Sequence, residues 1–353
     1  MGNDLNQNLA DSGDARHDLV VGLDAGGTRT RAMCVSVADG RLLGEGSGGP
    51  GNALTVPEPQ LTDHLAEAIA AAVPESARDR VVAVAGGFAG ATGASADDPG
   101  YVHARSALTE ALRRLGIPPG PVALCSDIEA AFASAPGTPT DGLALVAGTG
   151  AVAVRIAGRR ATTTVDGDGW LLGDDGSGFW IGRGAVRAAL RMADGRGAST
   201  GLAVSVGRAF GVPEEALPGG GSSYDVERGG RPDWSLTRRE DYRRHLLPVV
   251  MTDPPIRLAR LAPLVVEAAR QKDTVALGIL DEAADQLTAT VRALAPRAGE
   301  PLVATGGLLG PDGPLTEPLT IRLRALGLTL DWVADGCRGA VALARLAYGG
   351  DNR

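Results

Sequence analysis

The distribution of apolar and polar residues predicts a strand–turn–strand unit near the start of the chain. The apolar run Leu19–Leu23 has the length of a buried strand and ends at Asp24. Gly26 and Gly27 then allow a tight turn, and Thr28 adds a hydroxyl beside backbone N–H groups that can converge on an anion. Two more strands are expected after this turn, over Thr30–Val37 and Arg41–Glu45.

The same pattern occurs a second time. An apolar strand over Leu143–Ala147 is followed by the small turn Gly148-Thr149-Gly150 and by strands over Ala151–Ile156 and Ala161–Val165. One such turn is equally well explained as a simple hairpin with a glycine turn. Two copies, each with a turn of phosphate size at its first corner, predict two similar lobes that face one nucleotide.

The rest of the chain alternates further strands with helices of amphipathic spacing. Strands are expected over Val81–Ala85, Val122–Cys125 and Pro301–Thr305, and helices over Leu61–Val73, His103–Leu115, Leu258–Ala269, Val275–Leu294 and Cys337–Tyr348.

Composition narrows the class of protein. The chain has 353 residues, a net charge of −8 and a pI near 5.1, which argues against nucleic acid as a main partner. Its three cysteines are far apart, so neither a disulfide framework nor a zinc site is indicated. No apolar run has the length of a membrane span, and the first 17 residues lack the apolar stretch of a signal peptide. We therefore expect a cytoplasmic enzyme.

Lys272 is the only lysine in the chain. A Walker-type phosphate loop and a protein-kinase lysine are thus both excluded. Any nucleotide site has to work through backbone amides, hydroxyls, arginine and a metal ion.

Two motifs carry a resemblance to a known family. LDAGGTRT resembles the first phosphate loop, and VAGTGAVA the second, of the actin and sugar-kinase superfamily. Within this superfamily, the chain resembles the BadF/BadG/BcrA/BcrD ATPases and N-acetylglucosamine kinases over roughly Asp18–Tyr348, with a divergent middle. The resemblance implies an α/β, two-lobed, actin-like (ribonuclease H-like) fold, in which each lobe is a mixed sheet with flanking helices.

The expected organisation has a disordered tail over residues 1–17. An N-terminal lobe over 18–135 is completed by the helix 337–348, and a C-terminal lobe over 136–336 carries a variable insertion near 212–240. The resemblance also implies ATP and Mg²⁺ as cofactors, an amino-sugar substrate and a homodimer, with neither nucleic acid nor membrane as partner.

The nucleotide-binding residues follow from the resemblance. Asp24 would hold Mg²⁺ through water, since that ion keeps much of its hydration. A Gly-Gly pair after the strand Pro301–Thr305 resembles the family's adenosine loop, although such a pair is common after strands. The expected ATP-binding residues are Gly26, Gly27, Thr28, Arg29, Gly148, Thr149, Gly150, Gly306, Gly307 and Leu308.

Asp127 is the expected general base. It follows a strand, where a carboxylate can accept the proton of an attacking sugar hydroxyl, and the family's catalytic aspartate occupies this strand-to-helix corner. The alternative is structural: Ser126 and Glu129 have the spacing of a helix capping box, and Asp127 would favour the helix N-terminus by charge alone.

Sugar-binding residues are expected in two places. Asn52 can donate to and accept from a hydroxyl, and the family has an asparagine there that contacts the sugar, but a turn or cap is an alternative role. The stretch GWLLGDDGSGFWIG resembles the family's segment whose first acidic residue, here Asp174, contacts the sugar. Asp175 stands where the family usually has Glu. Asp168 and Trp170 are further candidates, since carboxylates and aromatic faces suit sugars.

The acidic stretch has two alternative interpretations. A calcium loop fails, because Leu171 stands where glycine is needed. A glycine-rich turn capped by Ser177 before a helix stays open.

The expected reaction is transfer of the ATP γ-phosphoryl group to the 6-hydroxyl of glucosamine. The acidic run of Asp166, Asp168, Asp174 and Asp175 would favour a partly protonated 2-amine over an acetamide. The composition, rich in Arg, Ala and Gly, is typical of actinobacterial proteins, where the family has a glucosamine kinase branch. Alternatives are an N-acetylglucosamine or other hexose kinase, an ATPase that activates a redox partner, and a sugar-sensing regulator.

Overall fold

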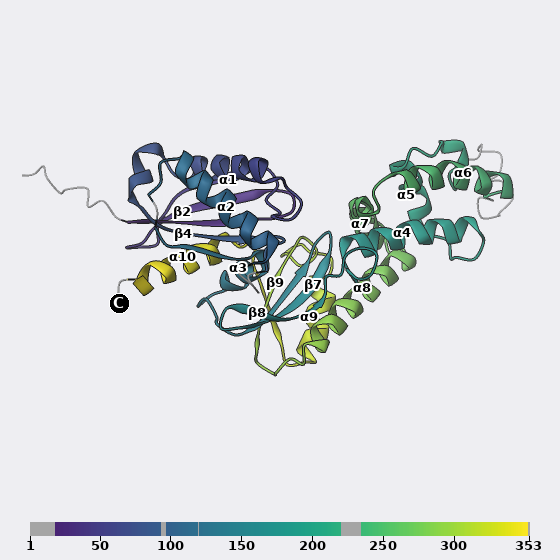
Figure 1. The fold of residues 1–353 in the computed structure, drawn as a ribbon. Helices are drawn as coiled ribbons and strands as arrows, with labels where there is room; N and C mark the ends of the chain where they lie inside the picture. The colour runs from purple at the N-terminus through teal and green to yellow at the C-terminus, as the bar shows by residue number, and fades with distance from the viewer. Residues whose placement is uncertain (1–17, 93–96, 119, 220–233, 352–353) are drawn as a thin grey trace, which may run out of the picture. The chain divides into compact units, whose positions relative to one another are not determined.

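The computed structural model describes residues 18–92, 97–118, 120–219 and 234–351. The chain divides into two compact units: unit 1 comprises residues 1–138 and 335–353, and unit 2 comprises residues 139–334 (Figure 1). The expected tail over residues 1–17 and the part of the expected insertion over 220–233 lie outside the described residues.

Unit 1 is built on a five-stranded mixed sheet of order β3-β2-β1-β4-β5. The central strand β1 (Leu19–Ala25) pairs antiparallel with β2 (Thr30–Ser36) and parallel with β4 (Val81–Phe88). The edges are β3 (Leu42–Gly48) and β5 (Val122–Ser126). Because the carboxyl ends of parallel strands meet at one edge of a sheet, the residues after β1, β4 and β5 are brought together.

The uninterrupted apolar run of β1 reflects burial on both faces of the sheet. Val21 and Leu23 belong to the core under α1 (Glu58–Ala72) and α2 (Pro99–Arg114), whereas Val20 packs against the C-terminal helix on the other face (Figure 1). The remaining helical segments of unit 1 are η1 (Glu75–Arg80), α3 (Asp127–Ala133) and α10 (Cys337–Asp351).

Helix α10 approaches β1 closely at Gly22. A Cβ atom at Gly22 would lie 2.5 Å from the backbone N of Val341 and 2.7 Å from the backbone O of Cys337, so no other residue fits without a shift. This contact brings the segment before α10, with Asp335, to the end of β1.

Unit 2 repeats the strand arrangement. Its sheet has the order β10-β9-β6-β7-β8. The central β6 (Gly142–Ala147) pairs antiparallel with β7 (Ala151–Ala157) and parallel with β9 (Pro301–Thr305), and the edges are β8 (Arg160–Asp166) and β10 (Thr329–Trp332). These two mixed sheets with flanking helices confirm the expected α/β fold class.

The hydrophobic core of unit 2 lies between its helices and one face of its sheet. The expected helix over Leu258–Ala269 is in fact two segments, because Pro263 has no N–H and fits only the first turn of a helix. The helical segments are α4 (Gly178–Ala193), α5 (Leu202–Ala209), η2 (Glu214–Ala216), α6 (Leu236–Thr252), η4 (Pro255–Leu261), α7 (Ala262–Arg270), α8 (Thr274–Ala293) and α9 (Thr316–Arg324).

Within the described ranges, no helix is both long enough and apolar enough to cross a bilayer.

Candidate active site

Two carboxylates lie at the same edge of the unit 1 sheet. Asp24 is opposite Gly87 in the β1–β4 ladder, and Phe88 is opposite Ser126 in the β4–β5 ladder, so only β4 separates Asp24 from Asp127. Gly87 lets the segment Asp127–Ala130 pack closely on β4, because a Cβ atom at Gly87 would lie 2.4 Å from the Cβ of Ala130 and 3.3 Å from the Cα of Asp127.

Asp127 is the first residue of α3, and its surroundings raise its pKa. Burial of the carboxylate and the neighbouring charge of Asp24 raise the pKa of Asp127 to about 6. The Ile128 N–H, which donates to Asp127 Oδ1 at 3.0 Å, acts in the opposite direction. A group with this pKa is largely ionised at neutral pH and can still accept a proton, which suits a general base.

The structural alternative for this corner is also correct. Ser126 caps α3 by accepting from the Glu129 N–H at 3.1 Å, and Glu129 Oε2 accepts from the Ser126 N–H at 2.9 Å. The capping box is therefore real, and it fixes the helix end on which Asp127 sits.

Asp24 is buried beside one cation and one further carboxylate. Arg31 Nη1 lies 3.2 Å from Asp24 Oδ2, and Arg31 Nε lies 3.8 Å from Asp335 Oδ2. Burial raises the pKa of Asp24, Asp335 raises it further, and Arg31 and the Gly336 backbone lower it. Arg31 and Asp335 did not emerge from the sequence. Arg31 could have been found from the hairpin register, but Asp335 reaches the site from the other end of the chain.

The donor set around Asp24 suits a hydrated ion. Within the described residues, no group of three or more His, Cys, Asp or Glu side chains could enclose a metal ion. Asp24, Asp127 and Asp335 nevertheless interact electrostatically, and a divalent cation would relieve the repulsion between these carboxylates. Mg²⁺ accepts such a site, because it keeps several waters and binds through few carboxylates plus substrate phosphates.

The first turn and Asn52 are tied together. The Gly26 N–H donates to the Arg29 carbonyl at 3.0 Å, which closes the turn, and the Gly51 N–H donates to the Gly26 carbonyl at 2.8 Å. Asn52 Oδ1 accepts from Leu54 N–H at 2.9 Å and from Thr55 N–H at 3.1 Å. The turn role expected as an alternative for Asn52 is therefore confirmed for its oxygen, which leaves its NH₂ group as the donor that a hydroxyl could meet.

A cavity of about 390 Å³ lies in unit 1 beside Arg29 of the first turn. Its lining includes Arg29 and Arg31, whose guanidinium groups are suited to phosphate oxygens. Thr28 and Arg29 are both exposed at the tip of the turn.

The second turn closes the β6–β7 hairpin in unit 2. The Gly148 N–H donates to the Gly150 carbonyl at 2.9 Å. Two N–H groups at the start of α4 form hydrogen bonds to the turn. Gly178 N donates to the Gly148 carbonyl at 2.8 Å, and Phe179 N donates to the Thr149 carbonyl at 3.1 Å. The exposed side of the turn, with Thr149, is left for a ligand.

Asp174 lies directly against this second turn. Its Oδ1 accepts from the Ala151 N–H at 3.0 Å, and a Cβ atom at Gly150 would lie 2.7 Å from the same oxygen. Asp174 is 7% exposed, and burial raises its pKa, with the charges of Asp166, Asp168 and Asp175 acting in the same direction.

Asp166 has a role that the sequence did not indicate. Its carboxylate accepts from the N–H groups of Gly167 at 2.7 Å, Asp174 at 2.6 Å and Asp175 at 2.9 Å. Asp166 and Asp174 both have left-handed backbone, with φ of 64° and 58°. Asp166 therefore organises the acidic loop, and its charge is used inside the loop.

The rest of the acidic loop is more accessible. Asp168 is exposed, Asp175 is half-buried, and Trp170, which is 37% exposed, meets the Phe179 ring edge-on with centroids 5.9 Å apart. Ser177 accepts from the Trp180 N–H at 3.2 Å. This confirms the alternative prediction that Ser177 caps the helix that follows it, which is α4.

The Gly306–Leu308 segment adjoins the second turn. Gly306 has a φ of +107°, and a Cβ atom there would lie 2.2 Å from the Ala147 carbonyl oxygen, so glycine is required. The Leu308 N–H donates to the same oxygen at 3.2 Å. The Leu308 side chain is 8% exposed and belongs to the core, which leaves only its backbone for a ligand.

The candidate residues thus form one group in each unit. Unit 1 brings together Asp24, Asp127, Asn52 and the 26–29 turn, while unit 2 brings together Asp174, the 148–150 turn and the 306–308 segment.

The chain is similar to several known proteins. A Clostridium acetobutylicum N-acetylmuramic acid/N-acetylglucosamine kinase is 28% identical over 183 residues. The matched stretch spans 51% of this chain and 56% of that relative, so the chain covers only about half the length of the curated relative that it matches.

Two solved structures share the fold. A candidate N-acetylglucosamine kinase from Chromobacterium violaceum is 24% identical, with a TM-score of 0.64, and the match covers 93% of this chain and 99% of that one. A ROK family glucokinase from Streptomyces griseus, in complex with glucose and AMPPNP, is 23% identical, with a TM-score of 0.50 and the same shares covered. The model of the BadF/BadG/BcrA/BcrD ATPase family matches residues 21–317, and the chain belongs to this family.

Proposed function

We propose that the chain is an ATP-dependent sugar kinase that phosphorylates the 6-hydroxyl of an amino sugar. The observation that carries the proposal is the environment of Asp127: a carboxylate with a pKa of about 6, fixed by a capping box and separated from Asp24 by one strand. The family and the names of the relatives support the same reaction class.

Three glycines in the candidate nucleotide segments give a second line of support. Gly27, Gly148 and Gly307 lack a left-handed φ, and no described atom beyond the adjacent residues lies within 4 Å of a Cβ atom placed there. Neither strain nor packing in the fold requires glycine at these positions. Close approach of a ligand to the backbone would require it, as in phosphate-binding turns.

Asp127 would act on the sugar hydroxyl. The carboxylate accepts the hydroxyl proton as the oxygen attacks the γ-phosphorus, and the bond from that phosphorus to the leaving ADP oxygen breaks. In the loose transition state typical of phosphoryl transfer, the protein contributes mainly positioning and charge stabilisation. The backbone N–H groups of the 26–29 and 148–150 turns, with the Thr28 and Thr149 hydroxyls and the Arg29 guanidinium, would bind phosphate oxygens. The 306–308 segment would lie against the nucleoside.

Asp24 would hold Mg²⁺ through water molecules. The ion would neutralise the charge that develops on the phosphate oxygens. Arg31 would keep Asp24 ionised, since its guanidinium lowers the pKa that burial raises.

Glucosamine is the proposed substrate, with Asn52, Asp174, Asp168, Asp175 and Trp170 as sugar contacts. The charge argument rests on Asp168, Asp174 and Asp175, because Asp166 already accepts three backbone N–H groups. N-acetylglucosamine is the second candidate, and the names of two relatives favour it.

Two other activities have less support. An ATPase that serves a redox partner through a cysteine-bound cluster would need accessible thiols, whereas Cys34, Cys125 and Cys337 are all buried. A sugar-sensing regulator would need neither the raised pKa of Asp127 nor both turns. A homodimer and a cytoplasmic location stay predictions from the sequence.

Sugar-dependent ADP release by the purified protein tests the proposal. We expect no release without sugar and the highest kcat/KM for glucosamine among glucosamine, N-acetylglucosamine and glucose. A higher kcat/KM for the acetylated sugar would refute the charge argument and keep the kinase. ADP release that no sugar stimulates would refute the kinase itself.

A further inference from the structure

We propose that unit 2 carries a second ligand site, for a small organic phosphate, in the pocket between α4 and α8. This α4–α8 pocket has a volume of about 470 Å³, within the range for small-molecule sites. It contains none of the turn or acidic-loop residues assigned above. The proposal does not depend on the kinase activity.

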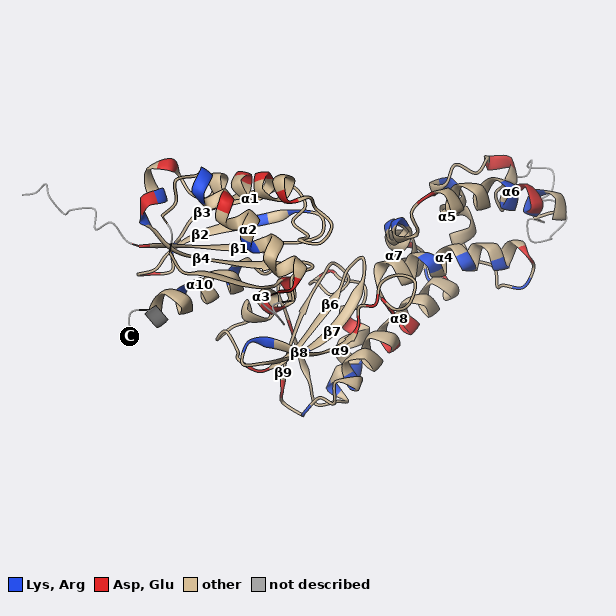
Figure 2. Ribbon diagram, viewed as in Figure 1, with Lys and Arg blue, Asp and Glu red and all other residues tan. Residues whose placement is uncertain are grey.

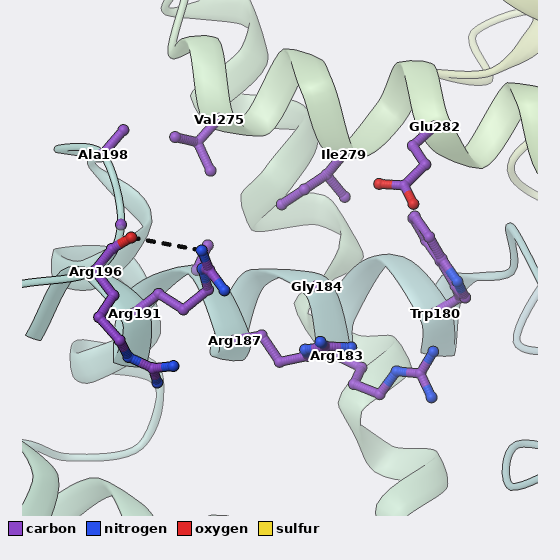
Figure 3. A pocket seen from close by; sticks show the side chains of 12 residues that line it. Trp180, Arg183, Gly184, Arg187, Arg191, Arg196, Ala198, Val275, Ile279 and Glu282 are labelled. Atoms are coloured by element: carbon purple, nitrogen blue, oxygen red, sulfur yellow. Dashed lines mark hydrogen bonds between the residues drawn. The ribbon is translucent and has the colours of Figure 1, made fainter. Parts of the chain in front are cut away.

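One wall of the pocket is basic. Arg183, Arg187 and Arg191 follow one another at four-residue spacing and so lie on one face of α4, and Arg196 follows just beyond the helix (Figures 2 and 3). Like charges at this spacing destabilise a helix. The fold therefore keeps three mutually repelling guanidinium groups in a protein whose net charge is −8.

The arginines on α4 also differ in their ion pairs from another arginine of unit 2. Within the described part of the chain, Arg183, Arg187 and Arg191 form no ion pair with a carboxylate. By contrast, Arg322 lies 2.7 Å from both Asp281 and Asp285 on α8. Arg183 lies over the Phe179 ring, with its Cζ 5.4 Å from the centroid, and Arg191 Nη2 donates to the Arg196 carbonyl at 3.5 Å. Arg187 and the other N–H groups of Arg191 are left for an anion, and guanidinium groups bind phosphate through two parallel hydrogen bonds.

The opposite wall has a different chemistry. Val275, Ile279 and Glu282 project from α8 toward α4, and the half-buried Trp180 ring lies near Glu282 (Figure 3). An apolar and aromatic surface with one carboxylate suits a hydroxylated ring, which stacks on Trp180 and donates to Glu282. The ligand should carry its phosphate toward Arg187 and Arg191 and its ring toward Trp180. A sugar phosphate and a nucleotide both have this chemistry.

Calorimetric titration of the full-length protein tests the site, with inorganic phosphate, a hexose 6-phosphate and a nucleoside diphosphate as probes. We expect saturable binding of at least one organic phosphate, and a loss of affinity of about tenfold or more in the Arg187→Gln/Arg191→Gln variant. Both residues are exposed, so the fold should tolerate the change. The arginine variant of α4 leaves the 26–29 and 148–150 turns unchanged, so it separates binding in this pocket from binding at the proposed nucleotide site.

Two further variants separate the parts of the site. Trp180→Leu should weaken the organic phosphate and leave inorganic phosphate unchanged. Arg270→Gln, which removes one positive charge from an exposed side chain of α7 outside the pocket, should have no effect. Whichever organic probe binds more tightly identifies the source of the phosphate. The proposal is overturned if no probe binds saturably at millimolar concentration, or if the double variant binds as the wild type does.

Discussion

Arg31 and Asp24 face each other directly across the β1–β2 ladder, with Nη1 3.2 Å from Oδ2. The pair is largely removed from solvent, because the Arg31 side chain is 29% and the Asp24 side chain 12% exposed. Asp24 is also the carboxylate that we propose to hold Mg²⁺. The pair therefore contributes to the stability of unit 1 and to the proposed metal site.

The first prediction concerns this pair. Arg31→Ala should lower the free energy of unfolding at pH 7 by about 1–3 kcal/mol, because it leaves a buried carboxylate without its cation. Chemical denaturation measures the change. Arg41→Ala is the matched control, since its 71% exposed side chain lies 4.0 Å from Asp39 and should contribute less than about 0.5 kcal/mol. Equal effects of the two substitutions would contradict the assignment.

The second prediction separates Asp24 from the general base. Asp24→Ala should lower turnover and raise the Mg²⁺ concentration needed for half-maximal rate, because the carboxylate no longer orients the hydrated ion. A Mg²⁺ titration of the variant measures both. If its midpoint equals that of the wild type, Asp24 does not hold the metal.

The third prediction is a pH dependence. Since the pKa of Asp127 is about 6, the carboxylate is ionised above pH 6 and accepts a proton below it. A protonated Asp127 cannot act as a base, so kcat/KM for the sugar should be level near pH 8 and fall about tenfold per pH unit below 6. A kcat/KM that stays level down to pH 5 would exclude Asp127 as the base.

Much of the fold follows from the sequence, because it depends on local patterns. The β1 and β6 strands are uninterrupted apolar runs, and the capping box at Ser126 has a recognisable spacing. Strand β10 was missed because it is a short edge strand with little burial, and α6 because most of its residues face solvent and Pro248 interrupts its pattern.

The site was less predictable than the fold. Asp166 reads as one more acidic residue in the sequence, whereas its importance comes from three backbone N–H groups that only the folded loop brings to it. Asp335 joins Arg31 only when α10 docks on β1 through Gly22. Contacts between segments that are far apart in the chain leave no local pattern.

The fourth prediction tests the glycine argument. Gly27→Ala and Gly148→Ala should each raise the KM for ATP by about tenfold or more, because a methyl group would occupy the space of a phosphate-bearing ligand, while thermal stability should be unchanged or slightly higher. Gly278→Ala on the exposed face of α8 is the control and should change only stability. An unaltered KM for ATP in both turn variants would remove the turns from the nucleotide site.

The most direct test of the account is the rate of sugar-dependent ADP release by Asp127→Asn beside its stability. An amide cannot accept the proton, so turnover should fall by about 10²-fold to 10⁴-fold with ATP affinity unchanged. Since burial raises the pKa of Asp127, its ionised form destabilises the fold above pH 6, and the variant should unfold at a higher denaturant concentration at pH 8. Lost turnover in a more stable protein is the predicted result, and near-normal turnover in the variant would contradict the mechanism.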